Sequence, residues 1–133
     1  MTVTKIKSHE EFEKLSCSGK PMVIDFWAAW CGPCKMISPV FEKLSNEIDG
    51  LNFVSVDVED PNFGLQEHGI RAMPTFQIIE NGVKVAEMVG ADQVKLRVCL
   101  LPYLHPPFSF LFKSFLNAVN CKPLKTNRPS FVF

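Results

Sequence analysis

Two of the five cysteines in the sequence, Cys31 and Cys34, lie three positions apart. In a helix this spacing places both thiols on one face, close enough for their sulfur atoms to bond. A thiol in the first turn meets unpaired backbone N–H groups and the positive end of the helix dipole, which stabilise its thiolate. Gly32 and Pro33, which lie between the cysteines, suit such a first turn. The sequence therefore predicts a thiol–disulfide redox pair in which Cys31 is the better nucleophile.

The cysteine pair lies between two segments of different periodicity. Residues 22–28 are apolar on both faces, which indicates a central strand. From Cys34 to about Glu47 apolar residues recur at helical spacing, and Gly50 stops this pattern. A buried strand is thus expected to deliver the chain to the start of a helix, where the cysteines lie.

The rest of the chain up to residue 101 alternates between strand and helix patterns. Ser8 and Glu11 form a capping box that opens a helix ending near Gly19, and Asn81-Gly82 predicts a tight hairpin between two antiparallel strands. Asp92 is expected to cap a last helix that Pro102 ends. The predicted order is βαβαβαββα, an α/β fold with a mixed sheet and helices on both faces. The further strands are expected at 3–6, 51–58, 75–79 and 83–89, and a short helix from Asp60 to about His68.

Composition and charge limit the classes of protein to consider. With 133 residues and 47% hydrophobic content, the chain has enough apolar side chains for one compact domain. Residues 1–92 hold all 14 acids and 8 of the 14 bases, whereas 93–133 hold 6 bases and no acid. These six charges are scattered rather than clustered with aromatic residues, so we expect no nucleic-acid binding.

The N-terminus and the cysteine count indicate a compartment. The first eleven residues contain no apolar leader segment, and no apolar stretch approaches the ~20 residues that span a bilayer, so no stable membrane insertion is expected. Five cysteines without repeated spacing are unlike a secreted disulfide framework. Both observations favour a reducing environment, and the expected location is the cytoplasm.

Four separated motifs resemble the thioredoxin family, in particular its small cytosolic eukaryotic members, over residues ~3–100. The resemblance implies a thioredoxin domain at 1–101, with a central mixed five-stranded sheet flanked by helices. The motifs are 25-DFWAAWCGPCK-35, Pro39 within the following helix, 71-RAMPTF-76, whose proline is cis in the family, and 89-VGA-91.

The resemblance also implies a role for each matching residue. Cys31 is the attacking cysteine, Cys34 the resolving one, and Asp25 a buried carboxylate that accepts the proton of Cys34. Disulfide-containing proteins are the implied substrates, and thioredoxin reductase recycles the pair. The chain shows no dinucleotide-binding loop, so we expect neither a bound cofactor nor a metal. The residues implied in substrate binding are Trp30, Gly32, Pro33, Met73, Pro74, Thr75 and Gly90.

Two positions depart from the family pattern. Ser55 stands where many bacterial members carry a lysine close to the buried aspartate, so Asp25 loses an electrostatic partner. Ala72 stands where some mammalian members carry a cysteine that supports dimerisation, so that route to a disulfide-linked dimer is absent.

Other functions are compatible with the pair of cysteines. A binding or scaffold module that uses the same surface, with the redox state as its switch, is the main alternative to a protein-disulfide reductase. A zinc site would need a second cysteine pair or a spaced histidine pair, which the sequence lacks. A secreted isomerase is disfavoured by the Gly-Pro pair and the missing signal sequence. Cys17 and Cys99 are expected to be packed small apolar residues rather than redox sensors.

Residues 102–133 form a Phe/Pro-rich extension that is atypical of the family. Phe108, Phe112, Phe115 and Val119 share one face of a potential short amphipathic helix. The extension is interpreted in three ways: an extra helix packed on the body, an apolar interaction or membrane-surface segment, or a translated intron. Oligomerisation through its apolar side chains is a further expectation. We favour the intron, because 100–112 uses only residues compatible with pyrimidine-rich codons.

Overall fold

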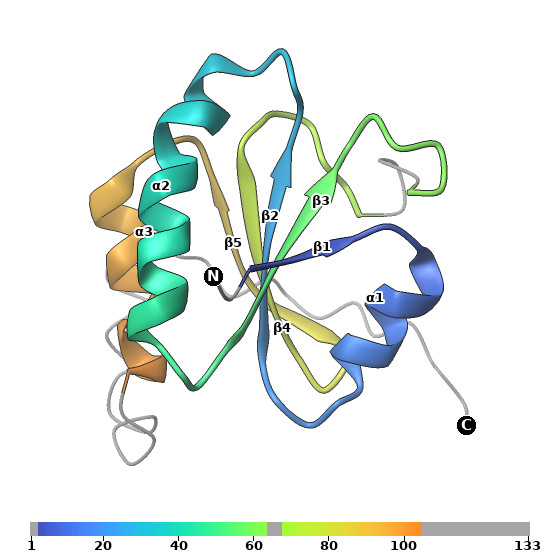
Figure 1. Cartoon of the computed structure of the whole chain (residues 1–133). Coiled ribbons are helices and arrows are strands. Elements are labelled where there is room, and N and C mark those ends of the chain that lie inside the picture. The colour runs from blue at the N-terminus through green and yellow to red at the C-terminus, as the bar shows by residue number, and fades with distance from the viewer. Residues whose placement is uncertain (1–2, 64–67, 105–133) are drawn as a thin grey trace.

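One mixed sheet forms the centre of the computed structural model, which describes residues 3–63 and 68–104 (Figure 1). Its strand order is β1-β3-β2-β4-β5, with β2 in the middle. β3 pairs parallel with β1 and β2, whereas β4 pairs antiparallel with β2 and β5. The predicted edge strand and central strand are confirmed. The strands are β1 (Val3–Ile6), β2 (Met22–Trp27), β3 (Asn52–Asp57), β4 (Thr75–Glu80) and β5 (Val83–Val89).

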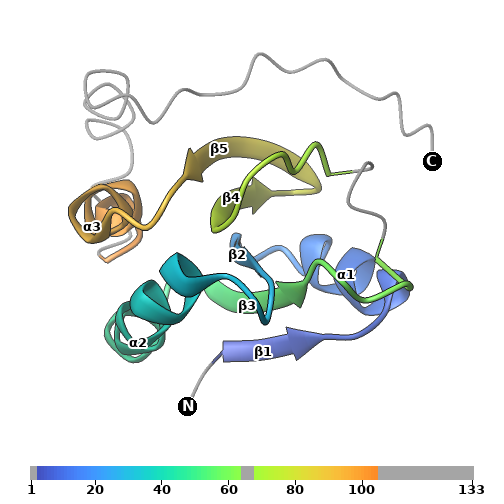
Figure 2. The same cartoon turned by 90° about the horizontal axis from the view of Figure 1, so that it is seen from above.

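Helices cover both faces of this sheet, as the sequence predicts. Figure 2 shows α1 (His9–Ser16) on one face and α2 (Gly32–Glu47) with α3 (Gln93–Leu100) on the other. Two apolar clusters fill the layers between sheet and helices, one with Phe12 of α1 and one with Phe41 of α2 and Leu96 of α3. None of the helices in the described part of the chain is long and apolar enough to cross a membrane.

The alternation of side chains along β2 determines where Asp25 points. Met22, Ile24 and Phe26 belong to the cluster under α1, and Val23 belongs to the cluster under α2 and α3. Because successive strand residues point to opposite faces, Asp25 shares the face of Val23 and lies under the helices that begin near the cysteines.

Local capping and turn chemistry confirm three of the predicted boundaries. Ser8 Oγ accepts a hydrogen bond from Glu11 N at 3.2 Å and caps α1, which ends at Ser16, three residues before Gly19. Asn81 and Gly82 have φ values of 52° and 75°, as a two-residue hairpin turn requires. α3 ends at Leu100, two residues before Pro102.

The helix predicted from Asp60 to about His68 is wrong in the part that the structure describes. Residues 61–63 and 68 lie in turns and bends, Asp60 has no regular secondary structure, and residues 64–67 lie outside the described residues. Asp60 Oδ1 accepts hydrogen bonds from Asn62 N at 2.9 Å and from its side-chain amide at 3.0 Å. Such side-chain hydrogen bonds compete with helix formation, because they satisfy backbone donors in a turn.

The chain continues past α3 into a short 3₁₀ helix, η1 (Leu101–Tyr103), that packs on the domain. Pro102 is buried, and Tyr103 Oη donates a hydrogen bond to Glu80 Oε1 on β4 at 2.5 Å. The domain boundary at residue 101 stays a prediction. The amphipathic helix expected at 108–119 lies outside the described residues.

Candidate active site

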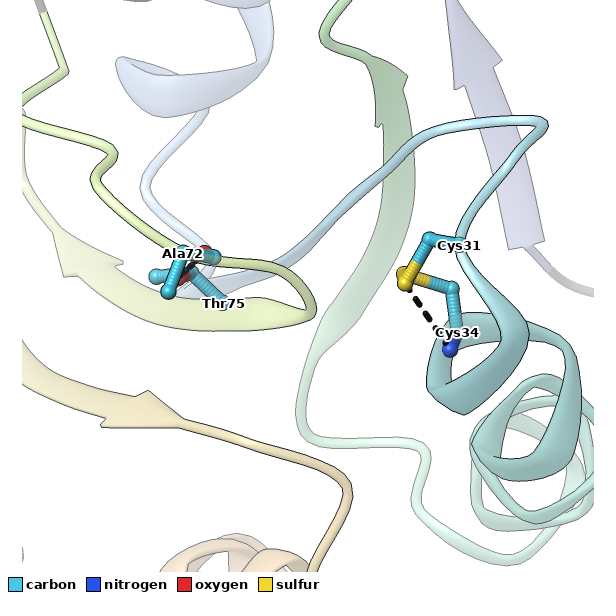
Figure 3. The surroundings of a disulfide bond; sticks show 4 residues. All are labelled: Cys31, Cys34, Ala72 and Thr75. Carbon is cyan, nitrogen blue, oxygen red and sulfur yellow. Dashed lines mark hydrogen bonds between the residues drawn. A yellow bond between two sulfur atoms is a disulfide. The ribbon is translucent and has the colours of Figure 1, made fainter.

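The two cysteines form a disulfide at the start of α2, with their Cα atoms 5.3 Å apart (Figure 3). Cys31 is the N-cap of α2, and its Sγ accepts a hydrogen bond from Cys34 N at 3.2 Å. Both residues are buried, with 4% and 3% of their surface exposed, so burial does not distinguish them. The hydrogen bond does, because it would stabilise negative charge on the Cys31 sulfur.

The end of β2 holds this disulfide in place. Cys31 N donates to Ala28 O at 3.1 Å, which closes a turn directly after the strand. Val58 N donates to Trp27 O at 2.9 Å and fixes the last residue of β2 to the chain that leaves β3. The cysteines are therefore carried by the most central strand of the sheet.

Among the described residues, Asp25 is the only one with a carboxyl group whose pKa is strongly raised by burial. Its side chain is buried, and Oδ1 has no hydrogen-bond partner among the described residues. Loss of water around the carboxylate disfavours its charged form and raises its pKa from 3.8 to about 7. A carboxyl group with such a pKa can exchange a proton near neutral pH.

Ser55 lies beside Asp25 on the neighbouring strand. The two residues are register partners of the parallel pair β2–β3, and Ser55 is buried. Residue 55 therefore provides no positive charge to compensate for the water that the Asp25 carboxyl group loses on burial.

A second loop, at residues 71–76, lies across from the disulfide in Figure 3. The Met73–Pro74 peptide bond is cis, and Thr75 Oγ1 donates to Ala72 O at 2.6 Å within the loop. Met73 is half-buried and packs against the apolar cluster that contains Cys31 and Cys34. The loop and the cysteine pair thus share one packed region.

The turn after β5 is joined to this loop. Gly90 N donates to Pro74 O at 2.9 Å, and Gly90 has a φ of 102°, which disfavours any residue with a Cβ. Three segments that are distant in the sequence therefore meet around the disulfide.

The structure separates the seven residues implied in substrate binding by exposure. Trp30, Gly32 and Pro33 are exposed, whereas Met73 and Gly90 are half-buried. Pro74 and Thr75 are buried, and the Thr75 hydroxyl is turned toward its own loop. The first five line the accessible surface, and the other two shape the loop beneath it.

Sequence reasoning missed two exposed apolar residues, one near the start of α2 and one near the start of α3. Met36 is 72% exposed and Val94 is 71% exposed, although the helical pattern placed Met36 among the packed residues of α2. Met36 and Ile37 are consecutive and cannot occupy the same helix face, and Ile37 is the one that is buried. Because consecutive helix residues point in different directions, the sequence could have indicated that one residue of Met36 and Ile37 is exposed.

The two other cysteines that the structure describes differ from each other. Cys99 is buried on α3, as predicted, but it is also disulfide-bonded, which the prediction of a merely packed residue did not include. Cys17 is an exposed free thiol at the end of α1, so its prediction as a packed residue is wrong. α1 ends one residue before it, and the C-cap position faces away from the core.

The chain is similar to known thioredoxins over most of its length. The family model described as Thioredoxin matches residues 3–100. A thioredoxin of Malassezia sympodialis is 49% identical over 100 residues, covering 74% of this chain and 95% of that protein. Thioredoxin-1 of Schizosaccharomyces pombe is 41% identical over 98 residues, covering 74% and 95%.

A solved structure agrees with this similarity. The crystal structure of the Malassezia sympodialis thioredoxin superposes with a TM-score of 0.73 at 47% identity, covering 77% of this chain and 91% of that one. Family model, relatives and fold, together with a cysteine pair at bonding distance, lead to one conclusion. The chain belongs to the thioredoxin family and is a thiol–disulfide oxidoreductase that acts on disulfide-containing proteins.

Proposed function

We propose that the chain is a cytoplasmic protein-disulfide reductase in which Cys31 attacks and Cys34 resolves. The observation that carries this assignment is the hydrogen bond from Cys34 N to Cys31 Sγ at the first turn of α2. In the reduced protein this donor and the helix dipole favour a thiolate at Cys31, which is the nucleophile in disulfide exchange.

The reaction consists of two exchanges that balance. The Cys31 thiolate attacks one sulfur of the substrate disulfide, forms a mixed disulfide and releases one substrate thiolate. The Cys34 thiol then loses its proton and attacks Cys31 Sγ, which releases the second substrate thiolate and leaves the Cys31–Cys34 disulfide. Two electrons pass from the cysteine pair to the substrate.

Asp25 is proposed as the acceptor of the Cys34 proton. Its carboxyl group lies on the sheet face under α2, and burial raises its pKa to about 7. Near neutral pH both forms of Asp25 are therefore populated, an ionised form that can take up a proton and a protonated form that can return it.

The exposed residues around the disulfide form the proposed substrate surface. Trp30, Gly32 and Pro33 present a rim next to Cys31, and Met73 with Gly90 closes its other side. Pro74 and Thr75 support this surface from inside through the Ala72 and Gly90 hydrogen bonds. An apolar surface of this kind is suited to receive a polypeptide segment around a disulfide.

Recycling requires a reductant of the oxidised pair, and we propose thioredoxin reductase as this partner. Oligomerisation through the Phe/Pro-rich extension at 102–133 is a separate proposal, supported by the apolar side chains of the sequence there. The proposal of thioredoxin reductase rests on the family resemblance, and the proposal of oligomerisation rests on the composition of the extension.

Reduction of insulin tests the proposed reductase activity. The wild-type protein with dithiothreitol should accelerate insulin precipitation, and Cys31→Ser should bring the rate down to that of dithiothreitol alone. Cys17→Ser is the matched control, because Cys17 is an exposed thiol outside the site and should leave the rate unchanged. If Cys31→Ser accelerates precipitation as the wild type does, the reductase assignment fails and a binding module that uses the same surface gains support.

A further inference from the structure

Each of the two helices beside the active site begins with an exposed pair of one lysine and one apolar residue. Lys35 and Met36 directly follow Cys34 on α2, and Val94 and Lys95 lie in the first turn of α3. All four side chains are exposed, Met36 to 72% and Val94 to 71%. We call these four residues the α2–α3 edge.

The α2–α3 edge is continuous with the surface around the disulfide. Figures 1 and 2 show α2 and α3 side by side, with their first turns at the end of the sheet where β2 runs into α2. Gly90, which leads into α3, is hydrogen-bonded to Pro74 at 2.9 Å, and Met73 packs against the cysteine cluster. A polypeptide that is bonded to Cys31 therefore has this edge within reach of its neighbouring residues.

The four residues contribute little to the stability of the fold. Neither lysine forms a salt bridge within residues 3–63 and 68–104, and the first turns of α2 and α3 contain no acid. A cation at the beginning of a helix is disfavoured by the helix dipole, and an exposed valine gains no burial. Asp92, the N-cap of α3, accepts hydrogen bonds from Val94 N and Lys95 N, each at 3.0 Å.

We propose that the α2–α3 edge determines substrate specificity by selecting protein disulfides whose cysteine is flanked by an apolar and an acidic residue. Met36 and Val94 provide the apolar contact, and Lys35 and Lys95 provide charge complementarity to the acidic side chain. This inference rests on the proposed reductase function and names its substrate class.

Two peptide disulfides of opposite charge provide the probe. Each is a symmetric disulfide of a short peptide, identical except that the cysteine is followed by Leu-Glu in one and by Leu-Lys in the other. The measured quantity is the ratio of kcat/KM for the two peptides with reduced full-length protein. The wild type should prefer the Leu-Glu peptide by about threefold, the size expected of one or two exposed ion pairs.

Charge reversal at the edge should change this preference. Lys95→Glu is expected to abolish or invert the ratio, mainly through KM, whereas Lys43→Glu should preserve it. Lys43 is exposed on α2 away from its first turn. The control therefore changes the net charge by the same amount without changing the α2–α3 edge. Val94→Ser should raise KM for both peptides about threefold, and its control Val83→Ser, which alters an exposed valine at the start of β5, should not.

A small neutral disulfide separates failure of this inference from failure of the proposed function. All four variants should reduce hydroxyethyl disulfide at the wild-type rate, because this probe is too small to reach the edge. If Lys95→Glu and Lys43→Glu give the same peptide ratio while hydroxyethyl disulfide is still reduced, the α2–α3 edge does not select substrates. If the wild type reduces none of the three probes, the reductase function itself is wrong.

Discussion

Asp25 on β2 and Ser55 on β3 are register partners on adjacent parallel strands, and both are buried. Side chains at register positions of neighbouring strands point to the same face, so residue 55 is placed to change the electrostatic surroundings of the Asp25 carboxyl group. With serine at this position, burial alone determines the raised pKa of Asp25.

Replacing Ser55 by lysine should lower the pKa of Asp25 by about 1 to 3 units, because a nearby cation favours the ionised carboxylate. The pKa is measured by following the Asp25 carboxyl carbon in an NMR titration of the oxidised protein. Ser55→Ala is the control, and it should leave the pKa near 7. An unchanged pKa in Ser55→Lys would show that the side chain at 55 does not reach the carboxyl group.

Asp25→Asn should stabilise the protein at high pH and not at low pH. The pKa of Asp25 is raised from 3.8 to about 7, so the folded state binds this proton more tightly than the unfolded state. The stability that results is fully present below about pH 4 and is lost as the pH rises through about 7. The ionised carboxylate then costs the folded state about 4 kcal/mol relative to the neutral form.

Urea unfolding of the oxidised protein at about pH 4 and about pH 8.5 measures this difference. Asp25→Asn should exceed the wild type in unfolding free energy only at the higher pH. Asp49→Asn, which changes an exposed aspartate, should follow the wild type at both. Equal stabilities of Asp25→Asn and wild type at pH 8.5 would contradict the raised pKa.

Cys34→Ser should accumulate a mixed disulfide between Cys31 and the substrate. The first exchange needs only Cys31, whereas release of the product needs the second sulfur. Mass spectrometry of the variant after incubation with a peptide disulfide should show one peptide bound per chain, removable by dithiothreitol. Cys31→Ser treated in the same way should show none at Cys34, because Cys34 lacks the N-cap position and the backbone N–H that would stabilise its thiolate. An adduct of equal yield in both variants would contradict the assigned roles.

Gly50→Ala should destabilise the domain through η1. A Cβ at residue 50 would lie 2.5 Å from the backbone oxygen of Tyr103, a distance that forces the chain end to move. Overpacking of this kind costs about 1–3 kcal/mol of unfolding free energy. Gly32→Ala is the control, since no atom lies within 4 Å of its added Cβ. If both variants unfold at the same urea concentration, residues 101–103 do not pack on the domain as described.

Tyr103→Phe examines the same chain end from the side chain. The hydroxyl donates to the Glu80 carboxylate, and a hydrogen bond to a charged group contributes about 1.5–3 kcal/mol. Thermal unfolding should therefore show a lower Tm for the variant at neutral pH. Burial and Glu80 together raise the pKa of Tyr103. Because ionisation of the hydroxyl would break the hydrogen bond, the pH dependence of the difference in Tm between wild type and variant also tests the contact. A Tm equal to that of the wild type would contradict the contact.

The sequence by itself determined the elements whose cause is local. The cysteine spacing with Gly32 and Pro33, the capping residue Ser8 and the turn residues Asn81-Gly82 each act within a few positions, so they predicted α2, α1 and the β4–β5 hairpin correctly. The helix predicted from Asp60 to about His68 is wrong in the described residues 60–63 and 68, because the Asp60 side chain accepts from the backbone N–H of Asn62 in a turn, which a periodicity argument does not count.

Tertiary structure alone decided which residues meet and which remain in water. The register that places Ser55 beside Asp25, the hydrogen bond between Gly90 and Pro74, and the contact of Tyr103 with Glu80 join segments far apart in the sequence. Exposure of Met36 and Val94 likewise depends on which helix face finds a partner. Periodicity reports the local backbone, whereas burial, and with it the raised pKa of Asp25, results from packing between distant elements.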